Sequence, residues 1–208
     1  MNIEHLLIIR FSTTIKNRGD NNLKKEILFN EDRLNSKLFL FETFCLRSII
    51  NQTLIKFRVI IIYDKDLPLK YYNKLYELVK DYNYIILHKW DINDDLGTNE
   101  WLQPYIDKTK DILITTRMDD DDILNININE WLYKYIKKKN FSKNKIISFK
   151  GGKFIYKEDD KYMLSPCNYP TPGLFLSYSN LINSNNNIYN FDHSKIKIPL
   201  KILKYNNC

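Results

Sequence analysis

A repeated alternation of apolar, β-branched runs with helix-like segments constrains the fold of this chain most strongly. Four runs have the length and composition of buried strands: 3–11 (IEHLLIIRF), 56–64 (KFRVIIIYD), 83–90 (NYIILHKW) and 111–117 (DILITTR). A helix-like segment follows each of the first three runs. Strands and helices in this order predict a parallel sheet with right-handed crossover connections. The sequence therefore predicts an α/β fold with a mostly parallel central sheet flanked by helices.

The helix-like segments carry different signals. In residues 31–52 the apolar side chains recur at helical spacing, which predicts an amphipathic helix: Leu34, Leu38, Phe41, Cys45 and Ile49. Residues 67–82 have Pro68 near the start, where a helix tolerates proline. Residues 99–110 are predicted to form a helix that Pro104 interrupts early.

The second half of the chain follows a different pattern. Residues 129–140 (NEWLYKYIKKKN) predict a helix, and residues 145–164 predict a pair of strands forming a hairpin that turns at Gly151 and Gly152. The stretch after residue 170 is rich in turn residues. No internal repeat and no linker divides the sequence, so we expect one domain over residues 1–208.

Composition limits the class of protein. The three cysteines are far apart and show no C-x-x-C spacing, which favours neither a disulfide framework nor a zinc site. No apolar run approaches the roughly 20 residues that span a bilayer. The net charge is +7, but the lysines are scattered and the chain, without alanine, is rich in residues with AT-rich codons. We expect a soluble, unexported cytoplasmic protein from an AT-rich genome, such as that of a virus or protist, and no nucleic-acid partner.

Polar side chains follow three of the predicted strands. Arg10 and Ser12 come after the first strand, Asp64 ends the second, and Arg117 and the aspartate run 119–122 follow the fourth. In open α/β sheets, ligands bind beyond the carboxyl ends of the strands. We therefore expect these side chains to converge at one edge of the sheet.

The four consecutive aspartates, Asp119 to Asp122, repel one another unless a cation or water offsets their charge. Hard oxygen ligands on a short, turned segment suit a divalent cation. A calcium loop starting at Asp119 is disfavoured, because Ile123 and Leu124 occupy the positions of an oxygen ligand and of the required glycine. A magnesium site of a phosphotransferase or nuclease remains an alternative, since it also uses acids after a strand.

Several segments together resemble a known family. They are IIRFS, RLNSKLFLFETFCLRSIINQT with the following FRVIIIYDKDLP, TTRMDDDDIL, and the late FDHSKI. This set resembles the putative rhamnosyltransferase family of GT-A-type glycosyltransferases, and its most specific part, residues 116–122, is similar to that family's T-R-L-D-x-D-D segment. The chain departs from the family in having Arg47 where a proline is expected, and in being compact after residue 170.

The resemblance implies a GT-A-like, Rossmann-type domain that binds a nucleoside-diphosphate sugar. Residues 1–124 would form the nucleotide-sugar-binding part and residues 125–208 the acceptor-side part. Asp119 and Asp121 would form the D-x-D motif that holds Mn²⁺ or Mg²⁺ on the donor diphosphate. The expected reaction is metal-dependent, inverting transfer of a sugar, with rhamnose as a candidate, to a glycan or other hydroxyl acceptor.

Other residues are assigned to the donor. Arg10 and Arg117 are expected to assist the departing diphosphate, and Ser12 and Asp119 to contact the donor. Asp64 is placed to accept hydrogen bonds from the base or the ribose. Lys16 and Arg18, on the loop after the first strand, are lid candidates.

Chemistry on the acceptor side requires a carboxylate base near the attacking hydroxyl. The candidates are Asp122 and Asp192, with the acidic cluster 158–160 as a weaker choice. His193, in FDHSKI, resembles the late histidine that returns to the metal in related folds, and it is expected to be a third metal ligand.

Two other functions stay open on the sequence alone. One is a magnesium-dependent phosphotransferase or nuclease, which would use the same acids. The other is a non-catalytic, basic module that binds sugars or nucleic acid, in which the acids would only be solvated.

Overall fold

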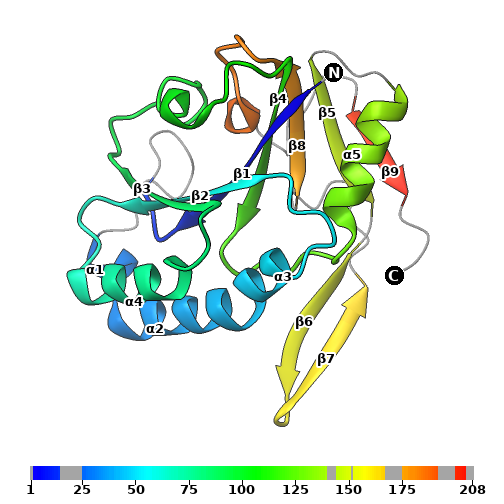
Figure 1. Cartoon of the computed structure of the whole chain (residues 1–208). Helices are drawn as coiled ribbons and strands as arrows, with labels where there is room; N and C mark the ends of the chain where they lie inside the picture. The colour runs from blue at the N-terminus through cyan, green and yellow to red at the C-terminus, as the bar shows by residue number, and fades with distance from the viewer. Residues whose placement is uncertain are drawn as a thin grey trace.

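The protein is described here from a computed structural model that covers residues 2–14, 25–139, 144–150, 152–166, 175–191 and 200–204 (Figure 1). These residues form a seven-stranded sheet in the order β3-β2-β1-β4-β8-β5-β9, together with a separate two-stranded sheet, β6-β7. The strands of the large sheet are β1 (Ile3–Phe11), β2 (Arg58–Asp64), β3 (Ile85–Trp90), β4 (Ile112–Asp119), β5 (Lys145–Lys150), β8 (Leu176–Leu181) and β9 (Leu200–Lys204).

The large sheet is mostly parallel, as predicted. β3, β2, β1 and β4 are parallel neighbours, β8 runs antiparallel to both β4 and β5, and β9 is parallel to β5. All four strands predicted in the first half of the chain are present. In the register of β1 and β4, Arg10 lies opposite Asp119, so the polar residues at the strand ends meet at the same edge of the sheet.

Both faces of β1 are buried, which explains its nearly continuous apolar sequence. Leu7 and Ile9 face a core formed with the long helices, whereas Leu6 and Ile8 face a second core. The helices against the first core are α2 (Glu31–Leu40), α3 (Arg47–Ile50), α4 (Leu69–Val79) and α5 (Ile128–Lys139). Over the second core lie turn-rich segments around η2 (Gln103–Tyr105) and η3 (Ile188–Asn190).

The amphipathic helix predicted over residues 31–52 is confirmed, but it is not uniform. It begins at α2, with the Asn30 side chain accepting a hydrogen bond from the Arg33 N–H, continues through a π-helical segment, η1 (Phe41–Leu46), and ends in α3. A short helix, α1 (Lys25–Leu28), precedes it. π-Helical turns often occur beside functional sites, and here Cys45 of η1 points its thiol toward the Asp119 carbonyl oxygen.

The helix predicted at residues 99–110 is wrong. Only a 3₁₀ turn, Gln103–Tyr105, forms there. Pro104 lacks an N–H donor and disfavours helical geometry in the residue before it. The Asn99 side chain also donates to the carbonyl oxygens of Ser184 and Asn186, so this segment is fixed by contacts to the C-terminal half rather than by its own periodicity.

The hairpin predicted to turn at Gly151 and Gly152 is also wrong. β5 pairs with β8 and β9 in the central sheet, whereas β6 (Lys153–Glu158) pairs with β7 (Lys161–Pro166). Their turn is formed by Asp159 and Asp160, which have φ values of 44° and 61°. Two positive φ values are the requirement of a tight hairpin turn, and aspartate tolerates this conformation better than most residues. Figure 1 shows the β6–β7 hairpin projecting away from the large sheet.

Among the described residues, no helix combines the length and the apolarity that a membrane crossing needs. The division into a donor part (1–124) and an acceptor part (125–208) stays a prediction.

Candidate functional site

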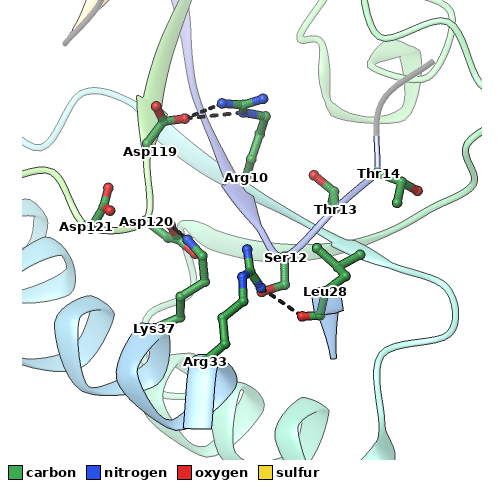
Figure 2. Close-up of a pocket in the computed structure, with 10 residues that line it drawn as sticks. All are labelled: Arg10, Ser12, Thr13, Thr14, Leu28, Arg33, Lys37, Asp119, Asp120 and Asp121. Atoms are coloured by element: carbon green, nitrogen blue, oxygen red, sulfur yellow. Dashed lines mark hydrogen bonds and ion pairs between the residues drawn. The ribbon is translucent and has the colours of Figure 1, made fainter. Parts of the chain in front are cut away.

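A pocket of about 210 Å³ opens at the carboxyl ends of β1 and β4, beside the first turns of α2 (Figure 2). Its lining combines residues that the sequence singled out with residues that it did not: Arg10, Ser12, Thr13, Thr14, Leu28, Arg33, Lys37, Asp119, Asp120 and Asp121. The predicted convergence of polar residues at this edge is therefore observed for Arg10, Ser12 and the aspartate run.

Asp119 is held by two arginines. Arg10 donates to its Oδ1 from Nη2 at 2.7 Å and from Nε at 3.2 Å, and Arg117 Nη2 lies 3.8 Å from its Oδ2. Burial raises the pKa of Asp119, but the charge and hydrogen bonds of Arg10, with further charge from Arg117 and Lys37, outweigh it and lower the pKa below its ordinary value. Asp119 is therefore ionised at neutral pH.

The ring of Tyr189, on η3, contacts the same two arginines. The guanidinium carbons of Arg10 and Arg117 lie 5.9 and 5.8 Å from the centroid of its ring, within cation–π range. Its hydroxyl donates to the Ile8 carbonyl oxygen at 3.4 Å. The ring thus ties the C-terminal segment to the sheet edge that carries Asp119.

Asp120 points toward α2 and forms an ion pair with Lys37. Its side chain is 2% exposed, and its Oδ2 has no hydrogen-bond partner within the described residues. Burial raises the pKa of Asp120 to about 6, although Lys37 acts against that rise. A buried acceptor without a donor is unusual in a folded protein.

Asp122 closes the turn after β4. It accepts a hydrogen bond on Oδ2 from the Asp119 N–H at 3.0 Å, and its own N–H donates to the Asp119 carbonyl oxygen at 3.2 Å. Burial raises the pKa of Asp122 to about 6. Its predicted role as the catalytic base is not tested by these contacts and stays a prediction.

Asp121 differs from its three neighbours. It is exposed, and in the part of the chain that the structure describes it has neither an ion pair nor a hydrogen bond. Four adjacent aspartates are thus tolerated because three of them are compensated separately: Asp119 by arginines, Asp120 by lysine and Asp122 by backbone. Among the residues that the structure describes, Asp121 is the member of the run whose carboxylate has no such partner.

Two of the three predicted metal ligands lie within the described residues. Asp119 and Asp121 both line the pocket and offer hard oxygen ligands, as a Mg²⁺ or Mn²⁺ ion requires. Within the described ranges, however, no three His, Cys, Asp or Glu side chains are grouped as a metal-binding set. Four predicted site residues lie outside the described residues. The third metal ligand, His193, and the base candidate Asp192 fall in residues 192–199, and the lid candidates Lys16 and Arg18 fall in residues 15–24.

Asp64 is buried at the end of β2. Its Oδ2 accepts a hydrogen bond from the Thr14 hydroxyl at 2.9 Å, and its Oδ1 accepts one from the Asp66 N–H at 3.0 Å. These contacts cap the strand and fix the start of the loop that follows β1. A contact from Asp64 to a base or ribose stays a prediction, and Asp64 is not part of the pocket lining.

Sequence reasoning missed Arg33 and Lys37. They lie four residues apart on α2, beside the buried Leu34 and Leu38, and therefore share one side of the helix. The available signal was a pair of basic residues flanking the apolar stripe of the helix that follows β1. That helix begins at the carboxyl edge of the sheet, which is where ligands bind.

Comparison with known proteins gives one family and several distant structures. No curated protein sequence matches the chain. Residues 1–349 of S. aureus TarS align with 71% of this chain and 35% of their own length, at 13% identity and a TM-score of 0.43. The same protein in complex with UDP-GlcNAc aligns with 71% of this chain and 34% of its own length, at 14% identity and a TM-score of 0.39. The mannosyltransferase PcManGT from Pyrobaculum calidifontis, in complex with GDP-Man and Mn²⁺, aligns with 70% of this chain and 34% of its own length, at 12% identity and a TM-score of 0.36.

This chain therefore spans about a third of the length of these solved proteins. The TM-scores are all below 0.5, so the family assignment does not rest on them. It rests on the family model described as putative rhamnosyl transferase, which matches residues 4–206, nearly the whole chain. The α/β domain with its arginine-bound aspartate run accordingly belongs to the putative rhamnosyl transferase family of glycosyltransferases.

Proposed function

We propose that this protein is a metal-dependent glycosyltransferase that binds a nucleoside-diphosphate sugar in the pocket between β1, β4 and α2. The sugar, with rhamnose as the first candidate, would pass to a hydroxyl of a glycan or another acceptor. The observation that carries the proposal is that the aspartates of the run have different partners. Within the described ranges, Asp121 has no ion-pair partner, and the neighbouring Asp119 is kept ionised by two arginines, so the two carboxylates can serve as ligands for a cation.

The residues present fit a divalent ion of the Mg²⁺ or Mn²⁺ type. Asp119 and Asp121 supply two hard oxygen ligands, and the donor diphosphate supplies others in the roughly octahedral shell that these ions prefer. When bound, the cation neutralises the negative charge that develops on the departing diphosphate. His193 is proposed as an additional ligand from residues 192–199.

The protein side chains have separate roles in this proposal. Arg10 and Arg117 orient Asp119 and keep it ionised, and Tyr189 keeps both guanidinium groups in place. Ser12 and Asp64 position the chain after β1, and through it the nucleoside.

Removal of the acceptor proton needs a base. Asp122 or Asp192 takes this role, and a raised pKa near 6 suits Asp122 to accept a proton near neutral pH. Attack from the face opposite the diphosphate would invert the configuration at the transferred carbon. The anomeric form of the product, read by NMR, tests that part of the proposal.

The experiment is a thermal-shift panel on the whole chain. UDP, GDP and dTDP, with their GlcNAc, mannose and rhamnose derivatives, are tested with Mn²⁺, with Mg²⁺ and with EDTA. The proposal expects one nucleotide class to raise the melting temperature only when a metal is present. Stabilisation that is identical in EDTA would contradict metal dependence.

The same panel separates the rival functions. A phosphotransferase or nuclease would release phosphate or cleave nucleic acid with Mg²⁺, without sugar transfer. A non-catalytic basic module would bind nucleic acid with an affinity that falls steeply with salt and does not depend on metal.

A further inference from the structure

Four of the charged side chains in the pocket neutralise one another. Arg10 is hydrogen-bonded to Asp119, and Lys37 is paired with Asp120. An arginine or lysine engaged in this way can serve a second anion only by sharing or losing its carboxylate partner. These two cations therefore hold the aspartate run in shape, and they are poor candidates for the main contact to a phosphate.

Arg33 is the cation of the pocket lining that pairs with no carboxylate in the described part of the chain. Its Nη1 donates to Ser12 Oγ at 3.1 Å and to the Leu28 carbonyl oxygen at 2.7 Å. A guanidinium carries five N–H donors, of which Nη1 supplies two. No described residue accepts from Nε or Nη2, so three donors of an immobilised guanidinium remain for a ligand.

The backbone conformation at Ser12 suggests that the Ser12–Arg33 hydrogen bond is part of a ligand-binding site. Ser12 has φ 48°, in the left-handed region that a serine adopts only at a cost. This conformation ends β1 and directs the Ser12 hydroxyl to Arg33. The next residue, Thr13, lines the same pocket, and its Oγ1 is buried without a hydrogen-bond partner in the described residues.

A second unsatisfied atom lines the same cavity. Asp120 Oδ2 belongs to a side chain that is 2% exposed, and it has no donor among the described residues. Buried polar atoms are normally satisfied by protein or water. The two orphan atoms, Thr13 Oγ1 just after β1 and Asp120 Oδ2 just after β4, belong to residues that line the same pocket as Arg33. Of the two, the Thr13 hydroxyl can donate a hydrogen bond to an anionic ligand.

We propose that Arg33, assisted by the Thr13 hydroxyl, binds the diphosphate of the donor, while Asp121 binds the cation on that diphosphate. This inference rests on the proposed function, because it assigns the phosphate-binding residue of the same site. Arg33 and Asp121, the two charges of the lining that have no ion-pair partner in the described part of the chain, match a ligand that carries phosphate oxygens and a metal ion together. The planar fork of arginine also fits two phosphate oxygens, which a lysine ammonium does not.

The test compares Arg33→Gln and Arg33→Lys with Arg47→Gln. Arg47 is exposed on α3, outside the pocket lining, so its variant removes the same charge from the same helical stretch. Isothermal titration measures the affinity of each protein for the nucleoside, its monophosphate, its diphosphate and inorganic pyrophosphate, all with Mn²⁺. Melting temperatures without ligand confirm that each variant is folded.

We expect Arg33→Gln to weaken diphosphate and pyrophosphate binding roughly 10- to 100-fold, the size of one charge-assisted contact. Nucleoside affinity should stay within about 2-fold, and Arg33→Lys should lie between Gln and wild type because it keeps the charge and loses the fork. Thr13→Val, which leaves Arg33 intact, should weaken diphosphate binding by roughly 3- to 10-fold. Arg47→Gln should bind like the wild type.

The outcomes separate this inference from the proposed function. Equal diphosphate affinity in the wild type and Arg33→Gln overturns the role of Arg33 and leaves the transferase proposal standing. An equal loss for nucleoside and diphosphate also overturns it, because Arg33 would then contact the base or only support the fold. If pyrophosphate binding depends on Arg33 but no nucleoside diphosphate binds the wild type, Arg33 is a phosphate-binding residue and the nucleotide-sugar donor of the proposed function is wrong.

Discussion

At the pocket, charged side chains are buried, whereas in the β6–β7 hairpin large apolar side chains are exposed. Asp120 is 2% exposed and Arg117 is 5% exposed, but Leu164 and Tyr162 of the hairpin are 59% and 56% exposed. Both regions depart from the usual rule that apolar groups are inside and charges outside. They do so in opposite directions.

The difference lies in how each departure is compensated. The charges at the pocket, of which Asp120 is fully buried and the others are partly exposed, are matched by side chains from distant parts of the chain: Arg10 with Asp119 and Lys37 with Asp120. In the hairpin, the apolar side chains of β6 and β7 are largely exposed, and the Tyr162 ring contacts Phe44 of η1, with ring centroids 5.9 Å apart. Substitutions in the charge pairs of the pocket should therefore change the free energy of unfolding more than substitutions in the hairpin.

The largest expected effect is at Asp121, the aspartate of the run without an ion pair or hydrogen bond in the described residues. Asp121→Asn should abolish the metal-dependent part of donor binding, because the amide cannot replace an anionic ligand. The free energy of unfolding should change by less than about 0.5 kcal/mol, since Asp121 is exposed. Thermal shift with nucleoside diphosphate and Mn²⁺ measures this, with the exposed Asp81→Asn as control. Undiminished manganese-dependent stabilisation in Asp121→Asn would remove it from the metal site.

A second test breaks a compensated pair. Lys37→Met leaves the Asp120 carboxylate buried without its partner and should lower the free energy of unfolding by about 3 kcal/mol or more at pH 8. Adding Asp120→Asn to Lys37→Met should restore most of that loss. Urea denaturation measures the free energy of unfolding of the wild type, the single variant and the double variant. A Lys37→Met protein as stable as the wild type would show that the pair is screened by solvent.

A third test compares equal truncations in the two regions. Ile61→Ala, at a fully buried position of β2, should cost about 2–5 kcal/mol, because it removes buried methylene groups and leaves a cavity. Leu164→Ala, in the hairpin, should cost no more than about 0.5 kcal/mol. Denaturant midpoints at constant slope measure both. Similar losses would mean that the hairpin is packed as part of the domain core.

The smallest effect concerns a buried polar group without a charged partner. Burial lowers the pKa of His5 to about 3 from 6.5, and its Nε2 shares a 2.8 Å hydrogen bond with the Thr116 hydroxyl. A lowered folded-state pKa contributes stability that is present above pH 6.5 and is lost as the pH falls toward 3. Stability should therefore fall by roughly 1 kcal/mol between about pH 7.5 and 5.5.

His5→Gln removes this titration and should flatten the profile in the same window. Urea denaturation at several pH values compares the two proteins. If wild type and variant have parallel profiles, His5 is accessible to protons in the folded state and its burial has no electrostatic consequence.

The first half of the fold was predictable because its signals are local. β1, β2, β3 and β4 are apolar, β-branched runs, and the helices between them show helical spacing or a proline at the start. Their alternation requires a parallel sheet, and a parallel sheet brings Arg10 and Asp119 to the same edge. The errors arose where local periodicity competed with distant contacts: the 99–110 segment is fixed by residues 184–186, and β5 pairs with β8 instead of β6.

Local sequence patterns alone predict that a polar, acidic edge exists and which strands bring residues to it. Apart from the family resemblance, these local patterns do not distinguish the four aspartates from one another, because they are identical in type and adjacent in the chain. The tertiary fold pairs Asp119 with Arg10, 109 residues away, and Asp120 with Lys37, 83 residues away, whereas Asp121 has no ion-pair partner among the described residues. The physical reason is that local patterns encode the period and ends of an element, whereas the partner of a charge depends on which elements pack against it.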